Sequence, residues 1–569
     1  MTVRTVLTLA FLALALASPA ANGKKKLPDY VTVPIDLKKS PIKDQRDSSC
    51  RPDLGYAGCL TEVFLYNEAF GAWAYGPGAE ATAAALQACG AKFIRQWNAL
   101  DEWQRGMAGE GNRASPKACF SLWKKCGIRV LLTIENYGVF VDKSLKKRSS
   151  DVEDLKRVVA SYLDWIVKNK FTDVVAGFEM GNEAYFGNDP ETYAARVEAI
   201  IPIILKAMPD AKIGIPIAEY RAGDPDLNVV RKRLGEKKMI AGGGEFSLNR
   251  LNQWSGRFVT ALSNQMDKVT HVIYHFYGGD GAYGCSAAGF DRIRKFAEIY
   301  PQLKGKRVWI SEWRERSDED QRCHQMFFST LWKAHYMLLV LSRPEVDGIN
   351  LHCLGCFAGG LNIGMNCSYY QGCPWIAGFF GQSDPLGGYN VHPDPDGGVG
   401  IRHYELGPAG PLFKMYTDAL MEHPIILERG TLTGGAGRDV SLWSSALYYG
   451  SARKRLSALA SGAKELPPVM GNVDWIAACD PARKSVALLM VNTMDRTVPI
   501  RLKCRQGRFT GTAKMSVLLC APGHVFSHGV PGEPPLWSLR EGQRPISRSS
   551  EAELQILGNT VQVVTLAIQ

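Results

Sequence analysis

The sequence predicts a (β/α)₈ barrel followed by an antiparallel β-sandwich. Three observations support this. The chain has 569 residues. A single hydrophobic core stops growing at about 250–300 residues, so we expect two domains. From Thr61 to Pro385, short β-branched apolar runs alternate with helical stretches, as in βαβ units. After His423, short alternating segments are separated by turn residues, which is typical of a sandwich.

The N-terminus has the pattern of a signal peptide. Arg4 supplies the charged end, an apolar run covers Val6–Ala17, and Ser18-Pro19-Ala20 supplies small residues for cleavage. We assign residues 1–21 to the signal and 22–60 to a leader and loop, so we expect a secreted or periplasmic protein. The apolar run is too short to span a bilayer comfortably, and we expect no membrane span.

Residues 61–422 are assigned to the barrel. An early strand is expected within Glu62–Tyr75, and seven further strands are expected at Phe93–Trp97, Val130–Ile134, Val174–Met180, Lys212–Ile217, Val269–Tyr277, Arg307–Trp313 and Gly348–Cys353. Helices are expected at Ala79–Cys89, Pro116–Cys126, Asp151–Lys168, Pro190–Ala207, Phe246–Met266, Ala287–Leu303, Glu319–Leu341 and Pro411–Glu422. Eight strands with intervening helices match a barrel with loop insertions. A doubly wound sheet is the alternative, but no G-x-G-x-x-G loop opens a helix here.

Two further regions complete the assignment. Gly355–Tyr404 is rich in Gly, Pro, Cys and Asn, which predicts a long loop after the last barrel strand. Residues 423–569 are assigned to the β-sandwich, with strands at Ser441–Tyr448, Val473–Ala478, Ser485–Val491, Val498–Cys504 and Val561–Ala567.

Fourteen cysteines in an exported chain predict several disulfides. Cys50 and Cys59 are close in sequence, as are the members of a second cluster, Cys353, Cys356, Cys367 and Cys373, but spacing does not give the pairing. A zinc site beside His352 is the alternative. We disfavour it because zinc clusters of this type are mostly intracellular, and we expect no metal and no cofactor.

The formal net charge of +11 narrows the choice of partner. A basic protein concentrates acidic polymers near its surface, which mildly favours glycans that contain uronic acids. The chain has no basic stripe with interleaved aromatic residues, so we expect no nucleic-acid binding.

Carboxylates stand at the ends of two predicted barrel strands. The fourth strand ends with Phe178–Glu183, and the seventh ends with Trp309–Trp313, which contains Glu312. Catalytic residues of such barrels lie at the C-terminal ends of the strands. Hydrolysis of a glycosidic bond needs two facing carboxyl groups, one to protonate the leaving oxygen and one to attack the anomeric carbon.

Gly181-Asn182-Glu183 together with Glu312 resembles clan A glycoside hydrolases. The longer string Phe178–Glu183 is similar to the aromatic-Glu-x-Gly-Asn-Glu motif of the arabinofuranosidase, β-xylosidase and heparanase-like families, which also carry a β-sandwich. The resemblance implies a retaining glycosidase that acts on a poly- or oligosaccharide. It implies that Glu183 is the acid/base and that Glu312 is the nucleophile.

The same resemblance implies roles for three more residues. Asn182 matches the residue that binds the sugar 2-hydroxyl, Arg95 the arginine that keeps the nucleophile ionised, and Tyr277 a hydrogen-bond donor to the nucleophile. The side-chain period of two places Glu179, Gly181 and Glu183 on one face of their strand, and His275 with Tyr277 on one face of theirs. We interpret Glu179 as a deeper structural carboxylate that pairs with Arg95.

Other strand-end residues are candidate sugar contacts. Asn136, Trp97 and His352 are expected to line the pocket, although an ordinary loop or barrel-capping role is the alternative for them. His275 is expected to line it beside Tyr277. Trp313 is expected to form a stacking wall, although the period of two directs its side chain away from the barrel mouth. Strand eight lacks the tryptophan with which many clan A endoglycanases end it, which favours the arabinofuranosidase and heparanase relatives. A non-catalytic carbohydrate-binding protein is the alternative function, and the presence of both glutamates argues against it. The sugar and the linkage stay open.

Overall fold

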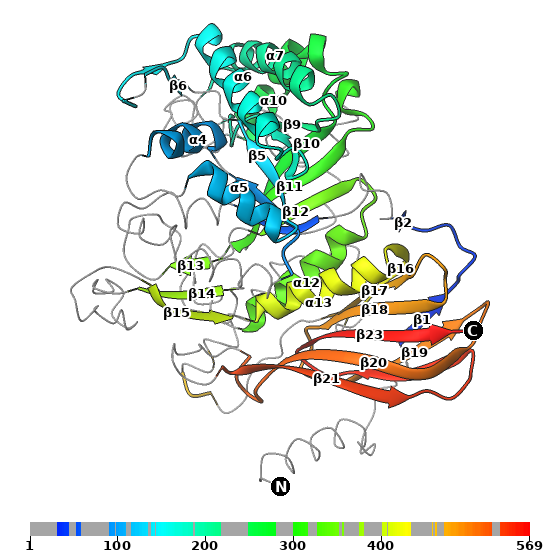
Figure 1. The fold of residues 1–569 in the computed structure, drawn as a ribbon. Coiled ribbons are helices and arrows are strands. Elements are labelled where there is room, and N and C mark those ends of the chain that lie inside the picture. The colour runs from blue at the N-terminus through cyan, green and yellow to red at the C-terminus, as the bar shows by residue number, and fades with distance from the viewer. Residues whose placement is uncertain are drawn as a thin grey trace, which may run out of the picture.

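The computed structural model describes two connected bodies, a barrel and a β-sandwich (Figure 1). The described residues are 31–44, 53–57, 90–96, 98–109, 115–134, 138–142, 144–185, 188–217, 248–279, 300–316, 327–351, 355–357, 375–379, 401–406, 408–433, 458, 461–463, 472–525 and 535–569.

The barrel is closed, and each strand pairs in parallel with its two neighbours. Its strands are β3 (Asp53–Ala57), β4 (Phe93–Gln96), β5 (Arg129–Thr133), β8 (Val175–Glu179), β9 (Ile213–Pro216), β10 (His271–Gly279), β11 (Arg307–Arg316) and β12 (Val346–Leu351). The predicted (β/α)₈ barrel is confirmed. Because the strands are parallel, their C-terminal ends meet at one rim.

The position of the first barrel strand was predicted wrongly. The barrel closes through Asp53–Ala57, which pairs with β12 on one side and β4 on the other, so the barrel begins before residue 61. Residues 62–75 lie outside the described part of the chain. The sequence Asp-Leu-Gly-Tyr-Ala contains no β-branched residue, and a search for β-branched runs therefore passes over it.

Helices cover the outside of the barrel (Figure 1). They are α4 (Ala99–Ala108), α5 (Pro116–Lys125), α6 (Val152–Lys168), α7 (Pro190–Ala207), α10 (Leu248–Ala261) and α12 (Phe327–Leu341), with short 3₁₀ turns at Ser263–Gln265 and Pro301–Leu303 and a small two-stranded sheet, β6 (Val139–Phe140) with β7 (Arg148–Ser149). The Asp151 and Asp189 side chains cap α6 and α7 by accepting backbone N–H bonds. Helix α4 was not predicted, and in the structure the side chain of Asn98 before it makes no N-cap hydrogen bond. The helix expected at Ala79–Cys89 and most of the one at Ala287–Leu303 lie outside the described residues.

One tryptophan fills much of the barrel interior. Trp309 packs with Phe93, Leu131 and Ile273, and the His271 ring stacks on it at 3.7 Å between centroids. A Cβ atom added to Gly177 would lie 2.4 Å from Trp309 Cη2, so this glycine provides the space for the indole. The interior is thus a packed core that supports the rim above it.

The sandwich has a seven-stranded and a three-stranded sheet. The larger contains β2 (Lys43–Asp44), β16 (Ile425–Thr433), β17 (Asn472–Cys479), β18 (Ser485–Asn492), β23 (Thr560–Ile568), β20 (Phe509–Cys520) and β21 (Trp537–Pro545); the smaller contains β1 (Val31–Ile35), β19 (Val498–Cys504) and β22 (Glu551–Ile556). Only β1 and β19 pair in parallel among these described strands. The predicted sandwich after the barrel is confirmed.

The central strand of the larger sheet, β18, is buried on both faces. Leu489 and Val491 of β18 belong to the core that it shares with the barrel, while Leu488 and Met490 face the interior of the sandwich. Helices α12 and α13 (Ala409–Glu422) lie between the barrel and this sheet (Figure 1). This double burial explains why β18 is apolar almost without a break instead of alternating.

Two stretches predicted as loops contain strands. Val31–Ile35 and Lys43–Asp44, assigned to the leader, pair with β19 and β16 and belong to the sandwich. Gly355–Tyr404 contributes to a small sheet of β13 (Gly355–Phe357), β14 (Trp375–Phe379) and β15 (Ile401–Leu406). The strands that pair with β1 and β2 are distant in sequence, and Gly-rich connections separate β13, β14 and β15. Local sequence patterns therefore do not indicate these strand pairings.

The described part of the chain has five cysteines with defined side chains, and none of these five forms a disulfide: Cys119, Cys126, Cys479, Cys504 and Cys520. The side chains of the cysteines expected to form disulfides lie outside the described part, so that expectation stays a prediction. Among the described residues, no helix combines the length and the apolar character needed to cross a bilayer.

We predict that Trp309→Ala lowers the free energy of unfolding by about 3–5 kcal/mol, because it leaves a cavity at the centre of the barrel. Urea unfolding followed by circular dichroism measures this. Met107→Ala on α4, where the side chain is 54% exposed, is the matched control and should change stability by no more than about 0.5 kcal/mol. Equal effects of the two substitutions would contradict the described interior.

Candidate active site

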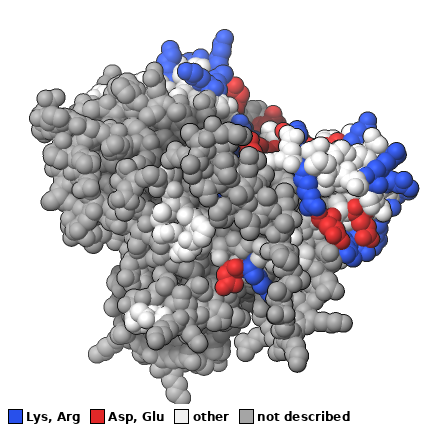
Figure 2. Space-filling view, turned by 90° about the horizontal axis from the view of Figure 1, so that it is seen from below, with Lys and Arg blue, Asp and Glu red and all other residues white. Residues whose placement is uncertain are grey.

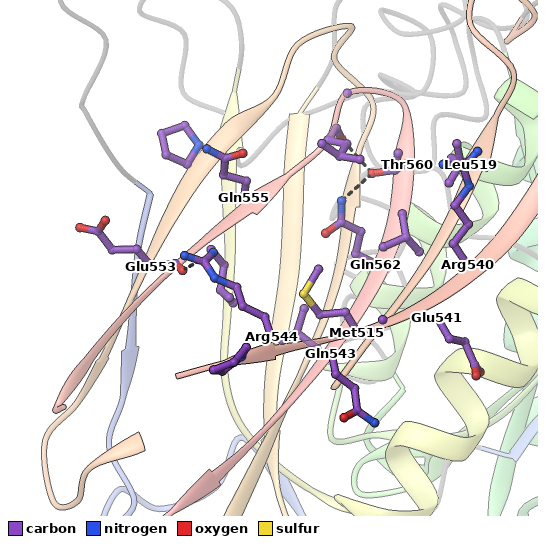
Figure 3. Close-up of a pocket in the computed structure, with 18 of the residues that line it drawn as sticks. Met515, Leu519, Arg540, Glu541, Gln543, Arg544, Glu553, Gln555, Thr560 and Gln562 are labelled. Carbon is purple, nitrogen blue, oxygen red and sulfur yellow. Dashed lines mark hydrogen bonds between the residues drawn. The ribbon is translucent and has the colours of Figure 1, made fainter. Parts of the chain in front are cut away.

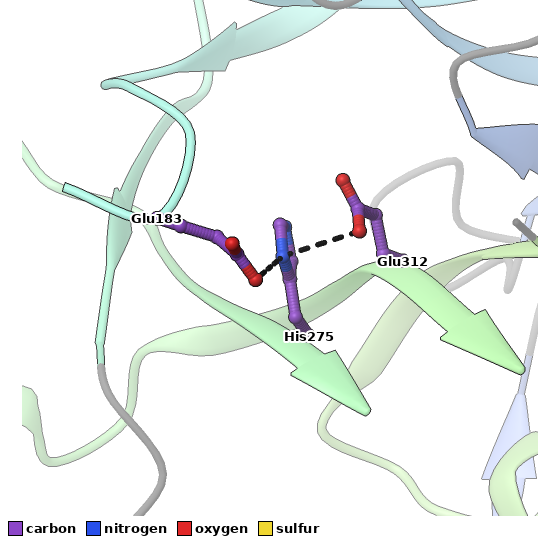
Figure 4. A group of neighbouring side chains, drawn as sticks. All are labelled: Glu183, His275 and Glu312. Carbon is purple, nitrogen blue, oxygen red and sulfur yellow. Dashed lines mark hydrogen bonds and ion pairs between the residues drawn. The ribbon is translucent and has the colours of Figure 1, made fainter. Parts of the chain in front are cut away.

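A cluster of charged side chains occupies the C-terminal rim of the barrel. Arg95 comes from β4, Glu179 ends β8, His275 lies on β10 and Glu312 on β11, while Glu183 follows β8. Figure 4 shows the His275 ring between Glu183 and Glu312. Barrel closure therefore brings together residues that are more than 200 positions apart in sequence.

Arg95 is the central cation. Its side chain is 1% exposed. It binds both oxygens of Glu179, with Nη2 donating to Oε1 at 2.9 Å and Nε donating to Oε2. Nη1 donates to Glu312 Oε1 at 2.6 Å, and Nη2 also donates to Asn182 Oδ1 at 2.7 Å. Burial by itself would lower the pKa of Arg95, but the two carboxylates outweigh burial and raise it. Arg95 thus stays charged and lies against the predicted nucleophile.

Glu179 is fully buried, with 0% of its side chain exposed. Besides Arg95, it accepts hydrogen bonds from Thr133 Oγ1 at 2.9 Å and from Ser311 Oγ at 3.0 Å. Burial favours the neutral acid, yet Arg95 and His275 outweigh it and keep the pKa of Glu179 below its ordinary value. Glu179 is therefore an ionised carboxylate that only accepts hydrogen bonds.

His275 connects the three carboxylates. Its Nδ1 lies 2.9 Å from Glu183 Oε1 and 3.4 Å from Glu312 Oε2, and its Nε2 lies 3.1 Å from Ser311 Oγ. Burial would lower the pKa of His275, but the neighbouring Glu312, Glu179 and Glu183 raise it to about 10. At neutral pH the ring therefore holds a proton that the surrounding carboxylates stabilise.

A strained turn presents Glu183. Strand β8 ends at Glu179, and Gly181 follows with a φ of 87°. An added Cβ there would lie 1.6 Å from Tyr193 Oη, whose hydroxyl donates to Met180 O at 2.8 Å. Glu183 itself has a φ of 44°, which is uncommon outside glycine. The regular alternation expected through Glu183 is therefore wrong, because a turn rather than the strand positions this residue.

Ser311 is a site residue that the sequence did not reveal. The pairing of β10 with β11 shifts so that Tyr274 is opposite Ile310 but His275 is opposite Glu312. Ser311 contacts Glu179 and His275, while Glu312 contacts Arg95, so both consecutive side chains reach the cluster. A strict period of two assigns them to opposite faces.

Tyr185 and Thr133 were also missed. Tyr185 Oη donates to Glu183 Oε1 at 3.4 Å, and burial together with nearby carboxylates raises the pKa of Tyr185 well above its ordinary value. It therefore remains a neutral donor. Thr133 ends β5, and its position as a polar residue at a strand end was the available signal.

Exposure increases from the base of the cluster to Glu183. The exposed side-chain fractions are 0% for Glu179, 11% for Glu312 and 29% for Glu183. Glu183 is thus the carboxyl group that a bound molecule reaches most readily. One ligand atom each from Glu183, His275 and Glu312 lies within 4.8 Å of the others. A divalent cation there would have to displace the proton of His275 beside Arg95, so these donors fit a metal poorly.

The remaining predicted site residues have different outcomes. Trp97, Asn136 and His352 lie outside the described residues, and Tyr277 lies on β10 with its side chain outside them. Trp313 is 0% exposed and packs against Trp332, Tyr336 and Phe413. Its predicted contact with sugar is therefore wrong, because the side chain points away from the barrel rim into the helical core.

The sandwich has a separate groove of about 580 Å³ between β20, β21, β22 and β23 (Figure 3). Met515, Arg540, Gln543 and Gln562 are among its lining residues, which include no histidine and no aromatic side chain. Glu541 and Glu553 also line this groove, and the Glu553 carboxylate pairs with Arg501. Acid/base chemistry therefore belongs to the barrel rim among the described residues.

Charged residues on the sandwich are mixed in sign. Figure 2 shows Lys and Arg side chains interspersed with Asp and Glu on this part of the described surface. Arg501 lies 3.0 Å from Glu553, and Lys503 lies 3.1 Å from Glu551. The net positive charge thus does not form one continuous basic patch on this view of the described surface.

No model of a known protein family matches the sequence, and comparison with curated proteins also gives no match. Solved structures do match. The α-L-arabinofuranosidase of Thermotoga maritima, solved with arabinose, superposes with a TM-score of 0.56 at 13% identity, covering 94% of this chain and 99% of that chain. A family 51 α-L-arabinofuranosidase of Bifidobacterium longum gives 0.55 at 11%, covering 95% and 100%. A glucosidase of Croceicoccus marinus gives 0.52 at 12%, covering 95% and 99%.

These similarities extend over barrel and sandwich together. The chain has the same fold as these glycosidases, as the motifs in its sequence predicted.

We predict that Arg95→Met destabilises the fold by about 3–5 kcal/mol at pH 7, because it leaves Glu179 buried without its cation. Glu179 has a lowered pKa in the folded protein, so its stabilising contribution is present at neutral pH and is lost as the pH falls. Removing Arg95 should therefore cost less at pH 4 than at pH 7. Urea unfolding at both pH values tests this.

Arg257→Met is the control for this experiment. Arg257 pairs with Glu191 on the surface, where the side chains are 57% and 48% exposed, so its loss should cost at most about 1 kcal/mol. A cost for Arg95→Met that is equally large at pH 4 would contradict the charge-based explanation.

Proposed function

We propose that this protein is a retaining glycoside hydrolase with Glu312 as nucleophile and Glu183 as acid/base. The single observation that supports this most strongly is the pair of carboxylates at the barrel rim. One oxygen of Glu183 lies within 4.8 Å of one oxygen of Glu312, His275 lies between the two side chains, and Arg95 holds Glu312. Retaining glycosidases use carboxyl groups about 5–5.5 Å apart, whereas inverting enzymes leave about 6.5–9.5 Å for a water molecule.

In the first step, Glu312 attacks the anomeric carbon and Glu183 donates its proton to the leaving oxygen. Arg95 Nη1, at 2.6 Å from Glu312 Oε1, stabilises the carboxylate before it attacks. The products of this step are the free leaving alcohol and a glycosyl ester on Glu312. In the second step, Glu183 takes a proton from water, which attacks the ester and releases the sugar with retained configuration.

Asn182 has a fixed place beside this pair. Its Oδ1 accepts from Arg95 Nη2 at 2.7 Å, which orients the amide at the rim next to Glu183. We assign to it the contact with the sugar 2-hydroxyl, a bond that strengthens in the transition state. Tyr277, on β10, is assigned the hydrogen bond to Glu312.

The substrate we propose is an oligo- or polysaccharide, with arabinofuranosides and glucosides as the first candidates. The motif Phe178–Glu183 supports this, and the structurally similar proteins are described as α-L-arabinofuranosidases and a glucosidase. We also propose that the protein is exported, on the basis of the charged and apolar N-terminal pattern. Disulfides among its remaining cysteines would fit that compartment.

We predict that Glu312→Gln lowers kcat on any hydrolysed glycoside by on the order of 10³-fold or more, because the amide cannot form the glycosyl ester. The measurement is initial rates over a panel of aryl glycosides and glycans. Glu422→Gln, an exposed change at the end of α13, is the control and should retain full activity. Substantial turnover by Glu312→Gln would reject the assignment.

Glu183→Gln should separate substrates by leaving group. We expect a loss of about 10²–10⁴-fold on alkyl and sugar leaving groups, which need protonation. Formation of the glycosyl ester from dinitrophenyl glycosides should fall far less, as pre-steady-state release of the phenol would show. An equal loss for both classes would argue against the acid/base role. A folded protein that binds glycans and hydrolyses none would support the non-catalytic alternative.

A further inference from the structure

Glu179 and Ser311 do not touch the place where a sugar would react, yet both are tied to His275. Ser311 Oγ lies 3.0 Å from Glu179 Oε1 and 3.1 Å from His275 Nε2. Glu179 Oε1 lies 3.7 Å from the same Nε2. These contacts extend from the buried base of the cluster to the ring that lies beside Glu183 and Glu312.

The hydrogen-bond directions in this chain follow from the donors available. Glu179 is ionised beside Arg95 and can only accept. Ser311 has a single hydroxyl hydrogen, and the contact with Glu179 uses it as a donor. The Ser311 oxygen must therefore accept from His275, which requires a hydrogen on Nε2.

We propose that Glu179 and Ser311 are positioning residues that keep a proton on Nε2 of His275, so that Nδ1 is the ring atom that shares a proton with Glu183. The inference rests on the proposed function of this site. Nδ1 and Glu183 Oε1 are 2.9 Å apart. This is a hydrogen-bond distance, across which one proton can transfer between the two atoms. Glu179 and Ser311, which lie at the buried base of the cluster, thus determine the charge and the tautomer of His275.

The proton balance of the reaction is then explicit. Before the first step, one proton is held jointly by Glu183 and Nδ1. Glu183 delivers it to the leaving oxygen, and the ring retains its Nε2 proton. In the second step, the attacking water gives up a proton to Glu183, which restores the shared state. No oxidant, metal or second acid is needed.

Every described charged group that faces His275 contributes to this shared state. Glu312 Oε2 lies 3.4 Å from Nδ1, Glu183 lies on the open side, and Glu179 lies beneath the ring. Arg95 contacts Glu179 and Glu312, and Tyr185 contacts Glu183. The three carboxylates together raise the pKa of His275, so neutralising one of them should lower it.

Glu179→Gln tests the proposal with almost no change in shape. It removes one carboxylate, and its amide can donate to Ser311, which frees the hydroxyl to donate to Nε2. We expect the titration midpoint of His275 to fall by about one unit or more and the neutral ring to carry its hydrogen on Nδ1. Nitrogen NMR of histidine-labelled protein reads both quantities, and the signal that disappears in His275→Gln identifies the ring.

Activity gives a second readout. The alkaline limb of the pH profile of kcat/KM reports loss of the shared proton. In Glu179→Gln this limb should move to lower pH, and in Ser311→Ala it should move in the same direction by a smaller amount. Thr260→Val is the matched control, because Thr260 lies on the outer helix α10 and its hydroxyl donates to Gly256 O at 2.8 Å. Its alkaline limb and its His275 signal should match those of the wild type.

The outcomes separate this inference from the proposed function. If Glu179→Gln leaves the titration midpoint of His275 at the wild-type value, or if Thr260→Val moves it as far, the positioning role is wrong even in an active glycosidase. If no glycoside is hydrolysed by the wild type, the proposed function fails, while the NMR titration still decides the tautomer.

Discussion

The architecture of the site depends on one buried guanidinium. Arg95 is shared by Glu179 and Glu312, which come from strands on different sides of β4 in the closed barrel. Burying charges is costly unless each one is paired, so removing one member of this cluster leaves its partners buried at a cost in stability. Closure of the barrel and pairing of these charged side chains therefore depend on each other. The same contacts that satisfy Arg95 also fix the orientation of the Glu312 carboxylate at the rim.

Rigid features below and beside the rim hold this arrangement. Trp309 fills the barrel interior where Gly177 leaves space for it. The turn at Gly181 is fixed by Tyr193, and Glu183 adopts an uncommon backbone conformation there. Strain of this kind persists only where the surroundings determine it. Helices α12 and α13 pack the barrel against the larger sheet, whose central strand β18 is buried on both faces.

The sequence predicted what local patterns encode and missed what distant pairing decides. Seven barrel strands were found because β-branched runs mark them. Glu183, Glu312 and Arg95 were identified because the motifs around them resemble those of clan A glycoside hydrolases, and His275 because the predicted sixth strand ends close to it. Asp53–Ala57 lacks a β-branched residue, and Val31–Ile35 pairs with a strand more than 460 residues away. A register shift brings Ser311 into the site, and period-two reasoning cannot anticipate such a shift. Trp313 was misassigned because its burial depends on α12 and α13.

The central claim is that Glu312 forms a covalent bond to the sugar. The most direct test is to incubate the protein with activated 2-deoxy-2-fluoro glycosides, whose second step is slow, and to locate the added mass by peptide mass spectrometry. This account predicts one sugar per chain, attached to the peptide that contains Glu312. Attachment to Glu183 instead, or release of product with inverted configuration and no adduct, would contradict it.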